Sequence, residues 1–183
     1  MIPAGNLLGV VLSGGESRRM GRDKGLLNTD GKPWALSMGD KLAHHQLPVV
    51  YSINKGQLPA YSAILSADSL IVDMDESQGP LNGLLSVHRQ FPRHDLLLVA
   101  CDMQDLDERT IMGLIAAYRI EEADCYAYEV EGYLQPFCAI YTAMALARAD
   151  ATMRMDSLQA VLRSGNLRRL PGEPAAFRNY NSL

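Results

Sequence analysis

A glycine-rich, basic stretch at residues 12–24 constrains this chain more than any other part of its sequence. It reads Leu-Ser-Gly-Gly-Glu-Ser-Arg-Arg-Met-Gly-Arg-Asp-Lys and follows an apolar run, residues 7–12, that has the character of a buried strand. Three glycines leave backbone N–H groups unhindered, and three arginines and a lysine concentrate positive charge beside them. That combination suits a polyphosphate. The alternative is a solvated turn, since loops favour the same residue types.

Neither of the two commonest phosphate-binding loops is present. Gly21 is followed by Arg-Asp-Lys, so the Gly-Lys-Ser/Thr of a Walker A loop does not occur. The dinucleotide pattern Gly-x-Gly-x-x-Gly is absent as well. A phosphate site at residues 12–24 must therefore belong to another class of protein.

The order of residues in this stretch resembles the signature of the molybdenum cofactor guanylyltransferases, which are nucleotidyltransferases of the NTP-transferase superfamily. Their pattern is Leu-Ala-Gly-Gly-x-Ser/Ala-x-Arg-Met-Gly-x-Asp-Lys, and here Ser13 replaces the usual alanine. Relatives that transfer CMP to the same pterin carry Leu-Ala-Ala-Gly, so Gly14 favours guanine. The resemblance implies Lys24 and Arg19 as catalytic charges, and nucleotide contacts at Leu12, Ser13, Gly14 and Gly15.

Composition narrows the class of protein further. A chain of 183 residues with 48% hydrophobic content can bury one core, which predicts a single domain over residues 1–183. The net charge of -4 argues against a nucleic-acid partner. Three cysteines without Cys-x-x-Cys spacing indicate reduced thiols, and no apolar run is long enough for a membrane span. We expect a cytoplasmic protein.

Strand and helix patterns alternate along the chain, which predicts right-handed crossovers and a mostly parallel sheet covered on both faces. The fold class expected is α/β, a three-layer Rossmann-like nucleotidyltransferase fold. The expected strands are residues 7–12, 48–53, 70–72, 95–100, 123–130 and 134–141. The expected helices are residues 33–45, 58–65, 80–89, 107–119, 142–149 and 157–163.

Three further segments resemble the family at positions that contact the nucleotide. Ser52 and Asn54 stand where the family tends to have Asn-x-Asn, although the shorter serine departs from that pattern and Asn54 is also a common turn former. Asp73 matches a position near the nucleoside, with a strand-end cap as the alternative. Gly79 and Gly83 lie in a Gly-Pro-Leu-x-Gly segment, where glycine lets backbone approach the base.

Asp102 is the candidate metal ligand. It follows the apolar run at residues 95–100, and carboxylates at such strand ends lie where open α/β sheets bind ligands. The family has Pro-Cys-Asp here, with Ala100 in place of the proline, and the resemblance implies that Asp102 binds Mg²⁺, a hard cation that needs only one or two protein carboxylates. Asn181, in a segment similar to the family's Asn-x-Asn-Thr-Pro ending, is the candidate second metal contact. A structural aspartate is the alternative for Asp102, and Asp105 is a weaker candidate ligand.

The resemblance implies transfer of GMP from GTP to molybdopterin, with release of pyrophosphate and formation of molybdopterin guanine dinucleotide. The implied partners are GTP, molybdopterin, and molybdoenzymes or their chaperones as recipients. Cys138 is expected to be a buried thiol rather than a nucleophile. Two alternatives remain: cytidylyl or other nucleotidyl transfer to a different phosphorylated acceptor, and a non-catalytic protein that delivers pterin or nucleotide. A basic patch, Arg163, Arg168 and Arg169, is either a solvated face or a second phosphate contact.

Overall fold

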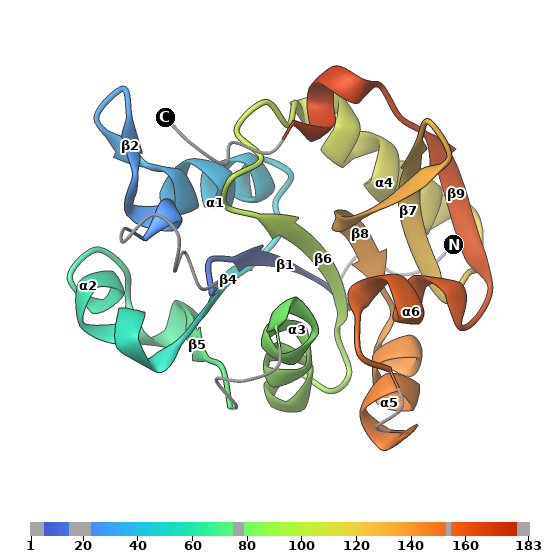
Figure 1. Ribbon diagram of the computed structural model, residues 1–183, viewed down its shortest axis with the longest axis horizontal. Coiled ribbons are helices and arrows are strands. Elements are labelled where there is room, and N and C mark those ends of the chain that lie inside the picture. The colour runs from blue at the N-terminus through green and yellow to red at the C-terminus, as the bar shows by residue number, and fades with distance from the viewer. Residues whose placement is uncertain (1–5, 15–22, 75–78, 153–154, 179–183) are drawn as a thin grey trace.

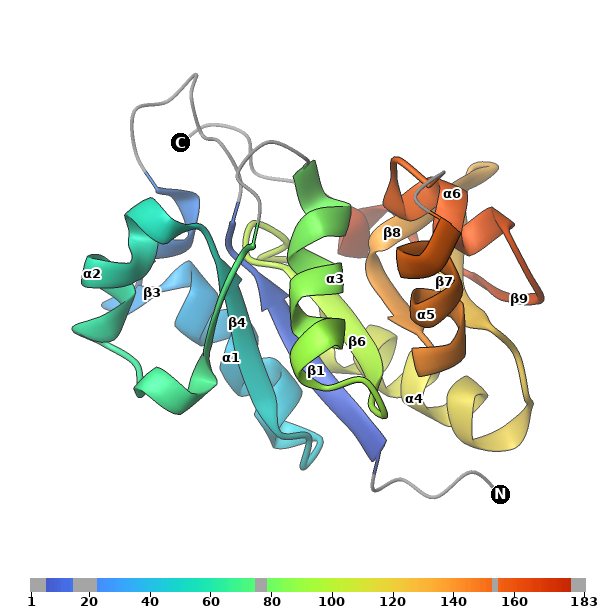
Figure 2. The same ribbon diagram turned by 90° about the horizontal axis from the view of Figure 1, so that it is seen from below.

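The computed structural model describes residues 6–14, 23–74, 79–152 and 155–178. A seven-stranded sheet with the order β5-β4-β1-β6-β8-β7-β9 lies at the centre, and helices cover both of its faces (Figures 1 and 2). Every neighbouring pair of strands is parallel except the two pairs that β8 makes, with β6 and with β7. The predicted α/β class and mostly parallel sheet are confirmed.

The strands are β1 (Leu7–Leu12), β4 (Val49–Ile53), β5 (Leu70–Val72), β6 (Asp95–Ala100), β7 (Cys125–Val130), β8 (Tyr133–Tyr141) and β9 (Leu167–Pro171). A separate small hairpin pairs β2 (Asn28–Thr29) with β3 (Lys32–Pro33). The α-helices are α1 (Trp34–His44), α2 (Leu58–Ser62), α3 (Gly79–Gln90), α4 (Glu108–Ile120), α5 (Ala143–Thr152) and α6 (Leu158–Arg163). Short 3₁₀ segments include η2 (Lys24–Leu26), η3 (Lys55–Gln57), η4 (Ala67–Ser69) and η5 (Pro174–Phe177). Among the described residues, no helix is both long enough and apolar enough to cross a membrane.

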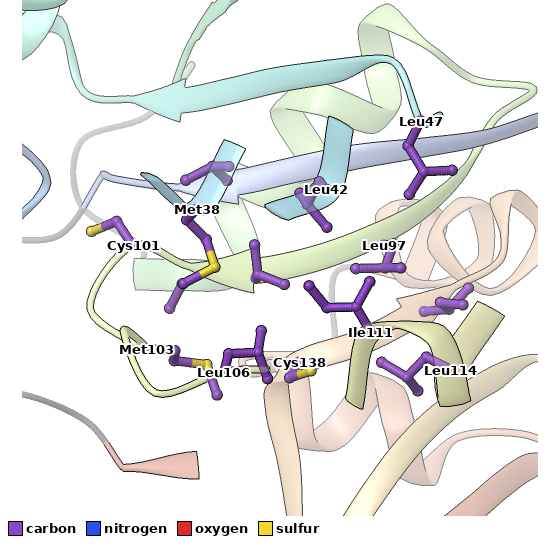
Figure 3. Packing of buried hydrophobic residues seen from close by; sticks show 14 of the residues in the cluster. Met38, Leu42, Leu47, Leu97, Cys101, Met103, Leu106, Ile111, Leu114 and Cys138 are labelled. Atoms are coloured by element: carbon purple, nitrogen blue, oxygen red, sulfur yellow. The ribbon is translucent and has the colours of Figure 1, made fainter. Parts of the chain in front are cut away.

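The central strands are apolar on both faces because both faces are covered. Side chains alternate along β6, so that Leu97 and Val99 join one core cluster while Leu96 and Leu98 join the other. The first cluster lies between the sheet and helices α1 and α4, and it includes Met38 and Leu42 of α1 together with Ile111 and Leu114 of α4 (Figure 3). The second lies under α3, α5 and α6.

Local sequence signals explain most element boundaries. Asp107 caps α4 by accepting a hydrogen bond from the Thr110 N–H, and Ser157 caps α6 in the same way. The turn between β7 and β8 consists of Glu131 and Gly132, both with positive φ, the conformation that suits a two-residue hairpin loop. Helix α2 is shorter than expected and ends at Ser62, because residues 63–65 form a turn.

Strand β9 was not predicted, because its sequence reads as a basic patch. Its two arginines are exposed and form ion pairs, Arg168 with Glu121 and Arg169 with Glu129. The strand exists because its backbone pairs in parallel with β7 at the edge of the sheet. These arginines lie three strands away from β6 in the sheet order, and their carboxylate partners favour the solvated-face interpretation of the patch.

Candidate active site

The carboxyl ends of β1, β4, β5 and β6 meet at one edge of the sheet, where open α/β sheets bind their ligands. Register places Leu12 of β1 beside Ser52 of β4 and Ala100 of β6. Beyond the strand ends the backbone stays tied together, since the N–H groups of Ser13 and Gly14 both donate to the Ser52 carbonyl at 2.9 Å. Sequence segments far apart in the chain therefore form a single surface.

Lys24 and Asp102 form an ion pair at this edge. The Lys24 Nζ atom lies 3.0 Å from Oδ2 of Asp102, although the two residues are 78 positions apart. Their side chains are 22% and 17% exposed, so the pair is screened from bulk water but open to a ligand. The predicted catalytic lysine and the predicted metal ligand thus lie side by side.

Asp73 follows β5 and lies against the backbone of Gly14. A Cβ atom at position 14 would lie 2.7 Å from Oδ2 of Asp73, so this close approach depends on glycine. Ser52 is fully buried and its hydroxyl donates to Oδ1 of Asp73 at 2.8 Å. Burial raises the pKa of Asp73 to about 6, and the Ser52 hydrogen bond offsets only part of this effect. Ser52, which was expected to contact nucleotide, therefore holds the Asp73 carboxylate in place through this hydrogen bond.

Helix α3 approaches the same edge through Gly83. A Cβ atom there would lie 2.5 Å from Oγ of Ser52 and 2.9 Å from Cδ1 of Leu12, and 3.3 Å from Oδ1 of Asp73. The glycine therefore lets the helix pack on the sheet. Gly79, at the start of α3, has a φ of 69° with open space around the position that a Cβ would occupy. The side chain of Leu12 is buried, so only its backbone lies at the site. The Leu12 carbonyl accepts a hydrogen bond from the Cys101 N–H at 3.1 Å.

Asn54 and Gln57 form a reciprocal capping box at η3. The Asn54 Oδ1 atom accepts from the Gln57 N–H at 3.0 Å, and Gln57 Oε1 accepts from the Asn54 N–H at 2.8 Å. The side-chain oxygen of Asn54 therefore stabilises a turn, which was one of the two roles expected for this residue.

Three residues of this region were not singled out from the sequence: Asp23, Gln57 and Tyr61. The Asp23 carboxylate accepts hydrogen bonds from the Gly25 N–H, the Gln57 amide and the Tyr61 hydroxyl, at 2.9, 2.7 and 3.3 Å. The sequence did contain signals for two of them. Asp23 belongs to the family signature, and the spacing Asn-x-x-Gln at Gln57 is that of a capping box. Nothing in the sequence indicates Tyr61, since a single tyrosine in a short helix has no distinctive spacing.

The side chain of Lys41 forms a clamp, the Lys41 clamp, on the segment that follows β6. The Lys41 ammonium donates to the carbonyls of Gln104 and Leu106 at 2.6 and 2.8 Å, and the Gln104 amide donates to the Cys101 carbonyl at 2.6 Å. Burial lowers the pKa of Lys41, which nearby Asp105 and Asp107 partly offset. The turn that carries Asp102 is thereby anchored to α1.

The donor set at this edge fits a magnesium ion that takes most of its ligands from substrate. The Asp102 carboxylate is a hard oxygen donor of the kind that Mg²⁺ prefers, and such ions commonly bind one or two carboxylates together with phosphate oxygens and water. The part of the chain that the structure describes contains no group of three or more His, Cys, Asp or Glu residues able to hold a metal by themselves. Three predicted site residues, Gly15, Arg19 and Asn181, lie outside the described residues.

The three cysteines are free thiols and all are buried, which confirms the burial expected for Cys138. Burial raises the pKa of Cys101 and of Cys125 to about 12, and it also raises the pKa of the fully buried Cys138. None of these thiols has the character of a nucleophile.

Comparisons with known proteins show the family to which the chain belongs. A curated relative, the molybdenum cofactor biosynthesis bifunctional protein of Synechocystis sp., is 36% identical over 141 residues, which cover 76% of this chain and 40% of that protein's length. The molybdenum cofactor guanylyltransferase of Xanthomonas euvesicatoria pv. vesicatoria is 30% identical over 95% of this chain and 89% of its own. The crystal structure of molybdopterin-guanine dinucleotide biosynthesis protein A from Archaeoglobus fulgidus shares the fold, with a TM-score of 0.74 and 22% identity over 95% of this chain and 92% of that one. Residues 9–170 match the MobA-like NTP transferase domain, and the chain belongs to that family.

Proposed function

We propose that this chain is a molybdenum cofactor guanylyltransferase, which transfers GMP from GTP to the terminal phosphate of molybdopterin and releases pyrophosphate. The observation that carries the proposal is the Lys24–Asp102 pair, held at 3.0 Å where the carboxyl ends of β1 and β6 meet. Membership of the MobA-like NTP transferase family supports it, as do curated relatives named for this activity.

The nucleoside of GTP is assigned to the surface formed by Gly14, Asp73 and the start of α3. Gly14 bears on the choice of base, because the CMP-transferring relatives have alanine at this position of the signature. A methyl group there would lie 2.7 Å from the Asp73 carboxylate and displace it. We therefore propose that Asp73, in the position it has here, contacts the guanine nucleotide. The Asn54 amide and the backbone at Gly79 and Gly83 are proposed as further contacts.

The reaction needs no nucleophile from the protein. An oxygen of the acceptor's terminal phosphate forms a bond to the α-phosphorus of GTP, and the bond from that phosphorus to the β-phosphate oxygen breaks, leaving its electron pair on pyrophosphate. The attacking oxygen is already anionic, so no catalytic base is required. Lys24 moves from Asp102 to the phosphate oxygens and neutralises the charge that develops in the transition state. Arg19 is proposed as a second cation for the same role.

Asp102 is the residue proposed to hold Mg²⁺, with Asn181 as the second protein contact. A bound cation would neutralise charge on the phosphate oxygens and orient them. The protein's part is to present the Asp102 carboxylate at a fixed position, which the Lys41 clamp on the following turn provides.

The test measures pyrophosphate release from GTP and molybdopterin with Mg²⁺, and nucleotide binding by calorimetry. Lys24→Ala and Asp102→Ala should each lower the rate about 100-fold or more, because each removes a charge that acts on the transition state. EDTA should weaken GTP binding by the wild type. Arg168→Ala and Glu121→Ala are controls, because these residues form an exposed ion pair at β9, three strands away from β6, and both variants should keep full activity.

Each alternative function has its own outcome in these assays. Tighter binding of CTP than GTP would reassign the chain to cytidylyl transfer. GTP binding without pyrophosphate release would favour a non-catalytic delivery protein. Full activity in Lys24→Ala would remove the lysine from the mechanism, even if GMP transfer itself is observed.

A further inference from the structure

The side chain of Gln57 joins three segments of the candidate site. Its amide nitrogen donates to the Ser13 carbonyl at 3.0 Å and to Oδ2 of Asp23 at 2.7 Å, and its oxygen accepts from the Asn54 N–H at 2.8 Å. The residue is 9% exposed, and its partners lie 44, 34 and 3 positions away in the chain. One amide thus ties the end of β1, the residue before Lys24 and the end of β4.

The bond to Asp23 determines where the backbone of Lys24 lies. Asp23 directly precedes the lysine, and Oδ1 of the same carboxylate accepts from the Gly25 N–H on the lysine's other side at 2.9 Å. The fully buried Tyr61 donates to that oxygen at 3.3 Å. Gly25 is packed so tightly that a Cβ atom would lie 2.1 Å from the Tyr61 hydroxyl oxygen. The peptide units around Lys24 are therefore fixed by Asp23, and Asp23 is fixed by Gln57.

We infer that Gln57 is a positioning residue for Lys24, acting through Asp23 so that the lysine ammonium is held beside Asp102 at the candidate site. The inference rests on the proposed function for its catalytic consequence. Lysine has a long, flexible side chain that loses much rotamer freedom when it is ordered, so an anchored backbone is what limits the positions its ammonium can reach. A small displacement of a catalytic group is costly, because rate depends steeply on orientation.

Only a carboxamide of this length makes all of these bonds. Two N–H groups face two acceptors, the Ser13 carbonyl and the Asp23 carboxylate, while the oxygen faces a donor. Glutamate has the same shape and keeps the acceptor of the capping box, in which glutamate is a usual residue. It would lose both donors and place a negative charge against Asp23. Gln57→Glu therefore breaks the bridge and spares the local turn.

The first experiment reads the position of Lys24 without catalysis. Wild type and Gln57→Glu are treated with an amine-acetylating reagent, and the rate of Lys24 modification is followed by mass spectrometry. In wild type the ammonium is paired with Asp102 and 22% exposed, so it should react slowly. The variant should react several-fold faster. Gln159→Glu is the matched control, since its amide also donates to a backbone carbonyl, that of Leu134 at 2.9 Å, and its Lys24 rate should equal that of wild type.

The second experiment tests the catalytic consequence. Gln57→Glu should lower kcat about 10- to 100-fold with a smaller change in the KM for GTP, because positioning acts mainly on the transition state. In a Lys24→Ala background the same substitution should lower kcat no further, because it acts through the lysine. Adding Asp23→Asn to Gln57→Glu should restore part of kcat, since an amide at position 23 can donate to a carboxylate at position 57.

Each outcome decides one question. Unchanged Lys24 modification in Gln57→Glu overturns the inference, as does an equal loss of kcat in the Lys24→Ala background. Unfolding of both Gln57→Glu and its combination with Asp23→Asn, seen as loss of the thermal transition, assigns Gln57 a purely structural role and also overturns it. If wild type releases no pyrophosphate, the proposed function fails alone, and the modification rates still decide whether Gln57 positions Lys24.

Discussion

Replacing Asp73 with asparagine should make the protein more stable at neutral pH while weakening its binding of GTP. The carboxylate is partly buried against Gly14 and Gly83 and accepts a hydrogen bond from one hydroxyl group, so its charge is poorly solvated. Its pKa is raised from 3.8 to about 6, a shift of about two units, and each unit corresponds to about 1.4 kcal/mol. Asparagine has the same shape and can still accept the Ser52 hydrogen bond.

The sign of the pH dependence follows from linkage. The folded-state pKa of Asp73 lies above its unfolded value, so the folded protein binds more protons between pH 3.8 and about 6. The free energy of unfolding contributed by this group therefore falls as pH rises through that window. At pH 7 and above, the ionised carboxylate should destabilise the fold by about 2–3 kcal/mol relative to asparagine. Near pH 4 the difference should vanish.

Urea unfolding of wild type and Asp73→Asn at intervals from pH 4 to pH 8 measures this difference. Asp68→Asn, at an exposed position of η4, controls for the general effect of removing a carboxylate. A difference between wild type and Asp73→Asn that does not grow with pH would refute the reasoning about burial. Calorimetry with GTP at pH 8 completes the test, and unchanged affinity would show that the buried charge serves no nucleotide contact.

Two further predictions concern packing and the thiols. Gly83→Ala should lower the free energy of unfolding by about 1–3 kcal/mol in urea titrations, because the added methyl group would lie 2.5 Å from Oγ of Ser52; a stability equal to wild type would mean that α3 shifts freely on the sheet. Cys101, Cys125 and Cys138 should resist a thiol-titrating reagent at pH 7 in the native protein and react fully after denaturation, because burial keeps them protonated and inaccessible. Rapid native reaction with loss of activity would point to a thiol role that the structure does not support.

Local patterns predicted the elements because each pattern has its own physical cause. The apolar runs that became β1 and β6 are buried on both faces, as a central parallel strand requires. Asp102 was predicted at the end of such a run, and the structure pairs it there with Lys24. Strand β9 was not predicted because its exposed arginines do not follow a strand pattern. It is a strand because its backbone pairs with β7.

The candidate site likewise has residues that the sequence indicated and contacts that only the structure revealed. Lys24, Gly14 and Asp102 could be singled out because a signature motif and a strand end are local features of the sequence. The support given by Ser52 to Asp73, and by Gln57 to Asp23, could not, because each depends on which strand ends become neighbours. Ser52 was singled out by its place in a motif, whereas its burial follows from the approach of Gly83 on α3.

The sequence by itself determined the α/β class, the glycine-rich basic stretch after the first strand and the carboxylate after the central strand, because hydrophobic period, backbone freedom and charge are properties of short segments. Tertiary structure alone decided the strand order and the 3.0 Å approach of Lys24 to Asp102. It also decided the burial that raises the pKa of Asp73 and the amide of Gln57 that links three segments. These features arise from contacts between residues tens of positions apart, and such contacts form only when the sheet assembles.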